Sequence, residues 1–174
     1  MATQEHIAKI MQAQQAFFAS GATIDVDFRI KSLRKLQAVI KRREAEINAA
    51  IQADLGKSAF ESYMCEVGLT LSELSCQLKH VRKWAKPQRV ASDLANFPSM
   101  YRTVAEPYGE VLVMSPWNYP FLLTIEPLIG AVAAGNCCVV KPSAYSPATS
   151  DCMASIIAEV FDPAHVTCIL GGRE

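Results

Sequence analysis

The segment 109–120 limits the possible folds of this chain more than any other. A short apolar run over 111–114 stops at the polar and aromatic sequence Ser115-Pro-Trp-Asn-Tyr-Pro120. This pattern predicts a buried strand that delivers Trp117 and Asn118 to its carboxyl end. Because open α/β sheets bind their ligands at that end of their strands, both side chains are candidates for a functional site. A rigidly held carboxamide there can donate to an oxygen that gains negative charge during a reaction.

The residues after this segment indicate a second strand. A helical stretch over 122–135 ends at Gly135, a residue type that is common at the C′ position of helices. The apolar run Cys137–Val140 is typical of a strand buried on both faces, and it delivers Lys141 to its end. Pro142 then ends the strand, because it has no N–H for the sheet ladder.

A third strand completes the pattern. A helix over 150–161, with Ser146 or Thr149 as its N-cap, leads to an apolar strand over 166–170. The order strand, helix, strand, helix, strand predicts a parallel sheet with right-handed crossovers. We therefore expect an α/β fold.

The first half of the chain is expected to be helical. A first helix covers 3–19, and a second helical region begins at Asp25 or Asp27, keeps apolar spacings near 3.6 residues and stops at Gly56. A third helix is terminated by Pro87. The apolar face of this third helix is expected to comprise Phe60, Met64, Val67, Leu71, Leu74, Leu78, Val81 and Trp84.

Composition argues against several classes of protein. Lys plus Arg equals Asp plus Glu at 17 each, so no long-range field favours nucleic acid or acidic membranes. The six cysteines form no CxxC pair, which argues against a metal site and fits a reducing compartment such as the cytoplasm. The N-terminus lacks the features of a signal peptide. Proline and asparagine interrupt the apolar stretch 111–140, whereas a membrane span needs about 20 continuous apolar residues.

Glycine-rich phosphate loops are not indicated. The chain contains no GxGxxG sequence, so the usual dinucleotide-binding fingerprint is missing. Gly130 and Gly135 have the spacing of a P-loop, but Asn136-Cys137 stands where lysine and serine or threonine are required. We expect these glycines to serve helix packing and the helix C-cap.

Four short motifs strongly resemble those of the NAD(P)-dependent aldehyde dehydrogenases. They are Ser115-Pro-Trp-Asn-Tyr-Pro120, Thr124-Ile-Glu-Pro-Leu128, Ala134-Gly-Asn136 and Val140-Lys-Pro-Ser143. The resemblance extends to Ala53-Asp-Leu-Gly-Lys57 and to the helix Glu61–Trp84, and so covers nearly the whole chain. The most similar branch is the class 3 type, which acts on fatty and aromatic aldehydes.

The resemblance implies an N-terminal helical layer and the first half of a Rossmann-like parallel sheet of the aldehyde dehydrogenase fold. Residues 1–87 would be helices that pack on the nucleotide-binding domain. Residues 88–108 would be a connector with a β element of the oligomerisation type near 100–105, and a homodimer is expected for the full-length enzyme. Residues 109–174 would be the first βαβαβ half of the NAD(P)-binding domain, truncated.

The resemblance also implies roles for individual residues. In the family, the carboxamide that matches Asn118 joins a backbone N–H in the oxyanion hole, and the lysine that matches Lys141 hydrogen-bonds the adenosine ribose of NAD or NADP. The remaining matches to cofactor-binding positions are Ser115, Pro116, Trp117, Ser143 and Ala144.

The chain departs from the family pattern at two points. None of its six cysteines matches the family's nucleophile, which lies further along than Glu174, as does the general-base glutamate. The 174-residue chain alone is therefore expected to be inactive. Many relatives also have a glutamate at the position of Ala144, where it accepts hydrogen bonds from the ribose. Alanine removes a charge that would repel a 2′-phosphate, so NADP is expected to be accepted as well as NAD.

The residues alone leave other interpretations open. Asn118 could be a helix N-cap ahead of Pro120, Lys141 could be a solvated strand end, and Trp117 could be a packed wall. The expected function is NAD(P)-dependent oxidation of an aldehyde to a carboxylic acid. The alternatives are a non-catalytic, truncated dimerisation partner and an acyl-phosphate or acyl-CoA reductase of the same fold.

Overall fold

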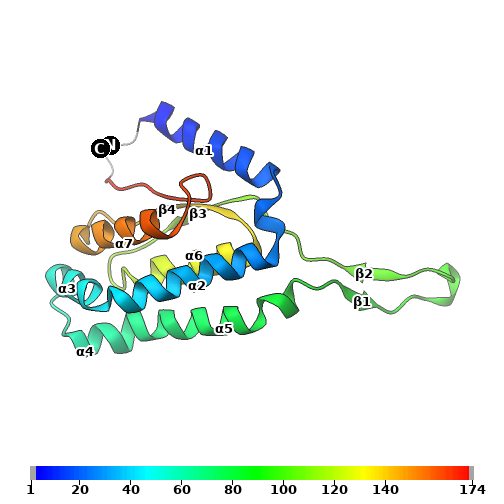
Figure 1. Ribbon diagram of the computed structural model, residues 1–174, viewed down its shortest axis with the longest axis horizontal. Coiled ribbons are helices and arrows are strands. Elements are labelled where there is room, and N and C mark those ends of the chain that lie inside the picture. The colour runs from blue at the N-terminus through cyan, green and yellow to red at the C-terminus, as the bar shows by residue number, and fades with distance from the viewer. Residues whose placement is uncertain (1–2, 173–174) are drawn as a thin grey trace.

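A computed structural model describes residues 3–172 and contains a three-stranded parallel sheet. The strands are β3 (Glu110–Met114), β4 (Cys137–Lys141) and β5 (Val166–Cys168), in the spatial order β3-β4-β5. Helices α6 (Leu122–Ala134) and α7 (Pro147–Val160) make the two crossovers (Figure 1). The predicted α/β pattern is confirmed, although α7 begins three residues earlier and β5 ends two residues earlier than expected.

Helices cover both faces of this sheet (Figure 1). Helix α1 (Gln4–Ala19) crosses one face, where the Gln14 amide donates to the carbonyl oxygen of Cys138 at 2.9 Å and the Cys137 thiol contacts the Gln14 carbonyl at 3.7 Å. Helices α6 and α7 cover the other face. Outside them lies a further layer, made of α2 (Val26–Arg42), α3 (Glu44–Leu55) and α5 (Gly68–Trp84). Both cysteines are fully buried, as expected for a strand covered on two sides.

The main core lies between this outer helical layer and the crossover helices. Its largest fully buried aliphatic side chains are Leu33, Leu36, Ile40, Ile47, Ile51, Leu74, Ile125, Leu128, Ile129, Met153 and Ile156. Helix α6 ends at Gly135, whose φ of 93° is left-handed, as the sequence predicted. A Cβ atom at Gly135 would meet the Arg29 guanidinium at 2.6 Å, so a larger residue would disturb the contact between α2 and α6.

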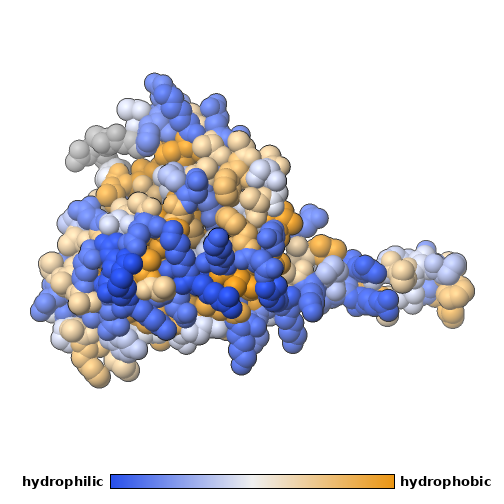
Figure 2. Space-filling view, in the orientation of Figure 1, coloured by the Kyte–Doolittle hydropathy of each residue, from blue (hydrophilic) through white to orange (hydrophobic). Residues whose placement is uncertain are grey.

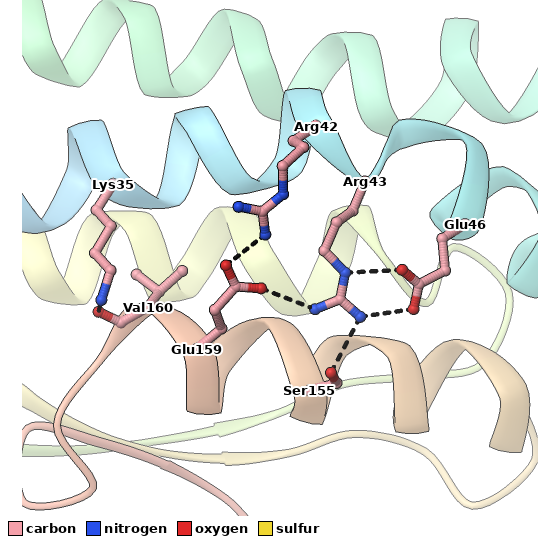
Figure 3. A network of polar contacts seen from close by, with 7 residues as sticks. All are labelled: Lys35, Arg42, Arg43, Glu46, Ser155, Glu159 and Val160. Carbon is pink, nitrogen blue, oxygen red and sulfur yellow. Dashed lines mark hydrogen bonds and ion pairs between the residues drawn. The ribbon is translucent and has the colours of Figure 1, made fainter.

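The second predicted helical region is two helices. It begins at Asp25, one of the two expected caps, whose carboxylate accepts from the Asp27 N–H at 3.0 Å. It breaks at Arg43, where φ of −100° and ψ of 17° leave helical geometry. The Arg43 side chain explains why a break is tolerated here, because it bonds across to α7 (Figure 3).

Arg43 is the centre of a polar network that joins α2, α3 and α7. Its guanidinium donates twice to Glu46, at 2.8 and 2.6 Å, and also to Ser155 at 3.0 Å and Glu159 at 3.4 Å (Figure 3). The hydrogen bond to Glu46 is the main cause of the raised pKa of Arg43 and of the lowered pKa of Glu46. Nearby, the Lys35 ammonium donates to the Val160 carbonyl at 2.8 Å, which extends the connection along α7.

The third predicted helix is interrupted by a π turn. Helix α4 (Ala59–Ser62) is followed by η2 (Tyr63–Val67), which has π geometry, and then by α5. A π turn inserts one residue, which rotates the apolar face by about 100°. The predicted continuous apolar face is therefore wrong at its start, where Phe60 and Met64 are 77% and 55% exposed. It is also wrong at its end, where Trp84 is 48% exposed and stacks on His80.

Residues 88–103 form a projecting hairpin. Strand β1 (Gln88–Val90) pairs antiparallel with β2 (Tyr101–Thr103), and the ribbon extends away from the helices (Figure 1). The strand expected near 100–105 is thus present, but 88–90, expected as connector, is a second strand. Figure 2 shows hydrophobic residues at the far end of the ribbon. Leu94 and Phe97, in the connection between the two strands, are 94% and 78% exposed.

Among residues 3–172, no helix is both long and apolar enough to cross a bilayer.

The first strand of the parallel sheet exposes apolar side chains. Within the described residues β3 has a strand partner on one side only, and Leu112 and Met114 are 60% and 70% exposed. These residues, with Pro127 and Tyr108, line a surface groove of about 480 Å³. An open apolar edge of this kind is a template for pairing with another chain.

We expect the 174-residue chain on its own to self-associate through this edge. Leu112→Glu together with Met114→Glu should shift the chain toward monomer, because charges on an edge strand oppose pairing. Sedimentation velocity over a wide concentration range measures the shift. Leu94→Glu with Phe97→Glu is the matched control, because it adds the same two charges to exposed apolar positions of the hairpin and leaves β3 unchanged. A monomer that persists at all concentrations and melts cooperatively would contradict the prediction.

Candidate functional site

The carboxyl ends of β3 and β4 lie side by side. Met114 is opposite Lys141 in the parallel register, and the Ser115 N–H donates to the Lys141 carbonyl at 3.3 Å. The two loops that carry the predicted site residues therefore start from adjacent points on one edge of the sheet.

The Ser115 hydroxyl ties the first loop to helix α6. It lies 2.6 Å from the Thr124 hydroxyl, which in turn donates to the Pro120 carbonyl at 2.5 Å. A hydroxyl has a single hydrogen. Since that of Thr124 is used on Pro120, Ser115 must be the donor to Thr124, and its own oxygen remains able to accept.

Trp117 and Asn118 lie on the exposed side of this loop. Trp117 is 54% exposed and Asn118 is also exposed. The N-cap alternative for Asn118 is wrong, because α6 begins at Leu122 and its N-cap position is Phe121. The carboxamide of Asn118 is therefore not used by the helix and faces solvent at the sheet edge.

The cap of α6 comes from a residue that the sequence did not single out. The Glu66 carboxylate, on η2, accepts from the N–H groups of Phe121 and Leu122 at 2.9 and 3.3 Å. Its other oxygen accepts from the Lys57 ammonium at 2.7 Å. Lys57 also donates to the backbone carbonyl of Asn118 at 3.1 Å. Lys57 ends the motif Ala53-Asp-Leu-Gly-Lys57, and Glu66 lies in the helix Glu61–Trp84. The family resemblance of these two segments was the only signal for both residues in the sequence.

Helix α7 is capped in the same way. The Asp54 carboxylate accepts from the N–H groups of Ala148 and Thr149 at 3.1 and 2.7 Å, and from the Thr149 hydroxyl at 2.7 Å. Ser146 occupies the N-cap position, as one of the two predictions had it, but its side chain makes no capping bond. Thr149 lies inside the helix, so that alternative is wrong. Pro147 starts the helix instead, at a position where its missing N–H is harmless.

These two carboxylates restrict where an anionic ligand can bind. The N-terminus of a helix ordinarily attracts phosphate groups through its free N–H groups and its dipole. Here Glu66 and Asp54 occupy those positions on α6 and α7, so a diphosphate would meet negative charge rather than free donors. This arrangement agrees with the absence of a GxGxxG sequence.

The second loop is organised by Lys141. Its ammonium donates to the carbonyl oxygens of Pro142 at 3.1 Å and Gly171 at 2.7 Å, which joins the end of β4 to the segment after β5. Because an ammonium has three N–H groups, one donor remains for a ligand hydroxyl. Ser143 accepts from the Tyr145 N–H at 3.2 Å and shapes the turn.

Ala144 is exposed in this second loop. A Cβ atom built at Gly172 would lie 3.6 Å from the Ala144 methyl group, so Ala144 and Lys141 both border the segment after β5. The residues predicted for cofactor binding thus form two adjacent groups, one at the end of each strand.

A three-stranded parallel sheet, with a carboxamide and a lysine at its carboxyl edge, defines the chain as an α/β protein of the kind that binds ligands at that edge. The sequence profile of the Aldehyde dehydrogenase family matches residues 1–174. The chain therefore belongs to the aldehyde dehydrogenase family.

Individual relatives agree with this assignment. The 4,4'-diaponeurosporen-aldehyde dehydrogenase of Staphylococcus aureus is 41% identical over 160 residues, which are 92% of this chain and 35% of that protein. Aldehyde dehydrogenase family 3 member H1 of Arabidopsis thaliana is 40% identical over 88% of this chain and 32% of its own length. The predicted similarity to the class 3 branch is confirmed. The chain spans about a third of the length of these relatives.

The fold is also that of solved members of the family. The substrate-bound state of Staphylococcus aureus AldH superposes with a TM-score of 0.94 at 40% identity, over 95% of this chain and 36% of that one. More distant neighbours of the same fold have been solved with NADP+ and with NAD+. The expected aldehyde dehydrogenase fold, with its helical layer and partial parallel sheet, is confirmed.

Proposed function

We propose that the protein containing this chain oxidises an aldehyde to a carboxylic acid, with NAD or NADP as the hydride acceptor. One observation carries the proposal: the exposed Asn118 residue lies at the carboxyl edge of the sheet, on a loop whose backbone is held by Lys57. Lys57 donates to the backbone carbonyl of Asn118 and leaves its carboxamide unused. Residues 1–87 act as the supporting helical layer. Residues 109–174 act as the first half of the cofactor-binding domain.

Asn118 is the proposed oxyanion donor. When a nucleophile attacks an aldehyde carbonyl, the oxygen gains negative charge, and a preorganised N–H stabilises it without reorganisation. The Asn118 NH2 group is suited to this role because α6 is capped by Glu66 and does not use the carboxamide.

Cofactor binding is assigned to the adjacent strand ends. Lys141 has one N–H left for a ribose hydroxyl, and Ser143 shapes the turn beside it. On the first loop, Ser115, Pro116 and Trp117 border the same edge. The carboxylates at the N-termini of α6 and α7 support binding of the diphosphate away from both helices. NAD(P), when bound, accepts the hydride of the aldehyde carbon.

The hairpin and the cysteines support proposals for the partners and the location of the protein. The projecting hairpin with its exposed Leu94 and Phe97 supports a homodimer of the full-length enzyme. The cysteines of the chain are free in the structure, which supports a reducing compartment such as the cytoplasm.

The direct test uses the native protein expressed over its whole reading frame. We expect NADH or NADPH to form when fatty or aromatic aldehydes are added, together with the carboxylic acid in equal amount. Nucleotide reduction without acid, or acid without nucleotide reduction, would contradict the proposal. Activity only with an acyl phosphate or acyl-CoA would favour the alternative reductase. No activity with any of these, together with stable association with a full-length relative, would favour the dimerisation partner.

Cofactor choice depends on Ala144. A carboxylate near a 2′-phosphate opposes it by about 1 kcal/mol in water and about 4 kcal/mol at an effective dielectric near 20. Ala144 is exposed, so the aqueous value applies. We expect the wild type to accept both cofactors. Ala144→Glu should lower the NADP/NAD ratio of kcat/KM about fivefold, the factor that corresponds to about 1 kcal/mol.

Ala144→Gln is the control for this prediction, because it adds the same bulk without the charge. Steady-state kinetics with each cofactor at saturating aldehyde give the ratio for all three proteins. Strict NAD specificity of the wild type, or equal effects of glutamate and glutamine, would contradict the assignment.

A further inference from the structure

We propose that Glu66 and Lys57 are positioning residues for Asn118, and that this buried pair fixes the loop on which the oxyanion donor stands. The inference rests on the proposed role of Asn118. It adds two residues from the helical layer, more than 50 positions away in the sequence, that act on the reaction only through that loop.

The pair contacts the loop at Asn118 and along the residues that lead from it to the start of α6. On the N-terminal side of the helix start, Lys57 donates to the Asn118 carbonyl at 3.1 Å and lies 4.0 Å from the centre of the Tyr119 ring. At the helix start itself, Glu66 accepts from the Phe121 and Leu122 N–H groups. Four of the five residues from 118 to 122 are therefore in contact with one ion pair.

Burial makes these contacts rigid. The Glu66 side chain is fully buried and that of Lys57 is 12% exposed, and the two are joined at 2.7 Å. Both oxygens of Glu66 accept hydrogen bonds, one from Lys57 and one from the backbone N–H groups. These bonds hold the carboxylate in one orientation. Charge-assisted bonds of this kind are stronger than neutral ones and hold their geometry.

Stability alone is a weak reason for such a pair. Burying two charges costs desolvation that their attraction only partly recovers, and apolar replacements are often neutral or stabilising. A local serine or aspartate would cap α6 without a buried lysine. The π turn that carries Glu66 is also a local irregularity of a type that is frequent at functional sites. Positioning of the Asn118 loop accounts for both features.

Two measurements on the native protein over its whole reading frame test the inference. The first is amide hydrogen exchange at Phe121 and Leu122, which reports the contacts directly. We expect Glu66→Gln to speed exchange at both sites by about tenfold, because the neutral amide oxygen of glutamine accepts a weaker hydrogen bond than the carboxylate does. Glu61→Gln, an exposed glutamate in α4 of the same segment, is the control and should change neither site.

The second measurement is a kinetic double-mutant cycle with Asn118→Ala. Glu66→Gln alone should lower kcat by about 10- to 100-fold, because small misplacement of a catalytic group has effects of that size. The KM values for aldehyde and cofactor should change little. In the Asn118→Ala background, the same substitution should cost less than about twofold, since the donor that it positions is already gone.

The double variant Glu66→Gln/Lys57→Met guards against loss of folding. The double variant removes both charges together and so leaves no unpaired buried charge. It should fold as well as the wild type and show the same exchange and kinetic effects as Glu66→Gln.

The outcomes separate this inference from the proposed function. Unchanged exchange at Phe121 and Leu122, or equal losses of kcat in the presence and absence of Asn118, would overturn the positioning role. Faster exchange with unchanged kcat, together with an unchanged kcat for Asn118→Ala, would instead overturn the oxyanion role of Asn118 and leave the loop contacts established. Faster exchange with coupled kinetic losses supports both.

Discussion

Replacing Asn118 with alanine is expected to lower the kcat of the native enzyme by about 10² to 10³, the loss measured for one oxyanion-hole donor. The donated hydrogen bond strengthens only as charge develops on the aldehyde oxygen. The loss should therefore appear equally in kcat and kcat/KM, with KM for the aldehyde nearly constant. The fold should be preserved, because Asn118 is exposed and α6 is capped by Glu66 instead.

Two further variants sharpen this prediction. Asn118→Asp should cost at least as much as alanine, because its carboxylate places negative charge where the oxyanion forms. Gln12→Ala removes an exposed carboxamide from α1 and should leave kcat unchanged. Initial rates of NAD(P)H formation at saturating substrate measure all three. If kcat of Asn118→Ala equals that of the wild type, Asn118 is not the oxyanion donor.

The parallel sheet and its polar edge were predictable because their signals are local. The apolar runs before Ser115 and after Gly135 define strands by composition alone, and parallel connections bring their carboxyl ends together. The register of Met114 with Lys141 confirms that the two loops start side by side. No distant residue had to be known to reach this arrangement.

The caps of the crossover helices were not predictable from sequence rules. Such rules search for a cap next to the helix, and they offered Asn118 for α6 and Ser146 or Thr149 for α7. None of the three side chains accepts the capping hydrogen bond. The carboxylates that do so, Glu66 and Asp54, come from about 55 and 95 positions earlier in the chain. Only the packing of the helical layer on the crossover helices brings them there.

The same limit applies to His165. In the sequence it has no partner motif, and the structure shows it buried among Phe17, Phe28 and Phe161. Burial lowers its pKa to about 4, so it is neutral near pH 7 and packs as an aromatic ring. Its partners come from α1, α2 and the end of α7, which the sequence could not place together.

The 174-residue chain by itself is expected to show no aldehyde oxidation at all. In the proposed reaction a cysteine thiolate would attack the aldehyde, and four of the six cysteines of this chain are unsuited to form one. Burial raises the pKa of Cys137, Cys152 and Cys168 to about 11 and that of Cys138 to about 12. At pH 8 a thiol with a pKa near 11 is ionised to about one part in 10³, too little for an efficient nucleophile.

The other two cysteines lie in the helical layer, on η2 and α5. Cys76 is the one with a histidine beside it, since its sulfur lies 3.6 Å from His80 Nδ1. That nitrogen is also 2.8 Å from the Cys76 carbonyl oxygen, which can only accept. Nδ1 must therefore carry the hydrogen, and it is not available to take the proton of the thiol. Cys65 lies next to Glu66 in η2, but both oxygens of that carboxylate are already bonded, to Lys57 and to the N–H groups of Phe121 and Leu122, so Glu66 is not placed to take the proton of the thiol.

The purified 174-residue chain, incubated with an aldehyde and either NAD or NADP, should give the same absorbance change at 340 nm as a blank without protein. The native protein over its whole reading frame serves as the positive control under identical conditions. Aldehyde-dependent NAD(P)H formation by the chain would contradict the prediction. Loss of that signal in Cys65→Ser or Cys76→Ser, with Cys152→Ser unchanged, would then place the nucleophile in the helical layer.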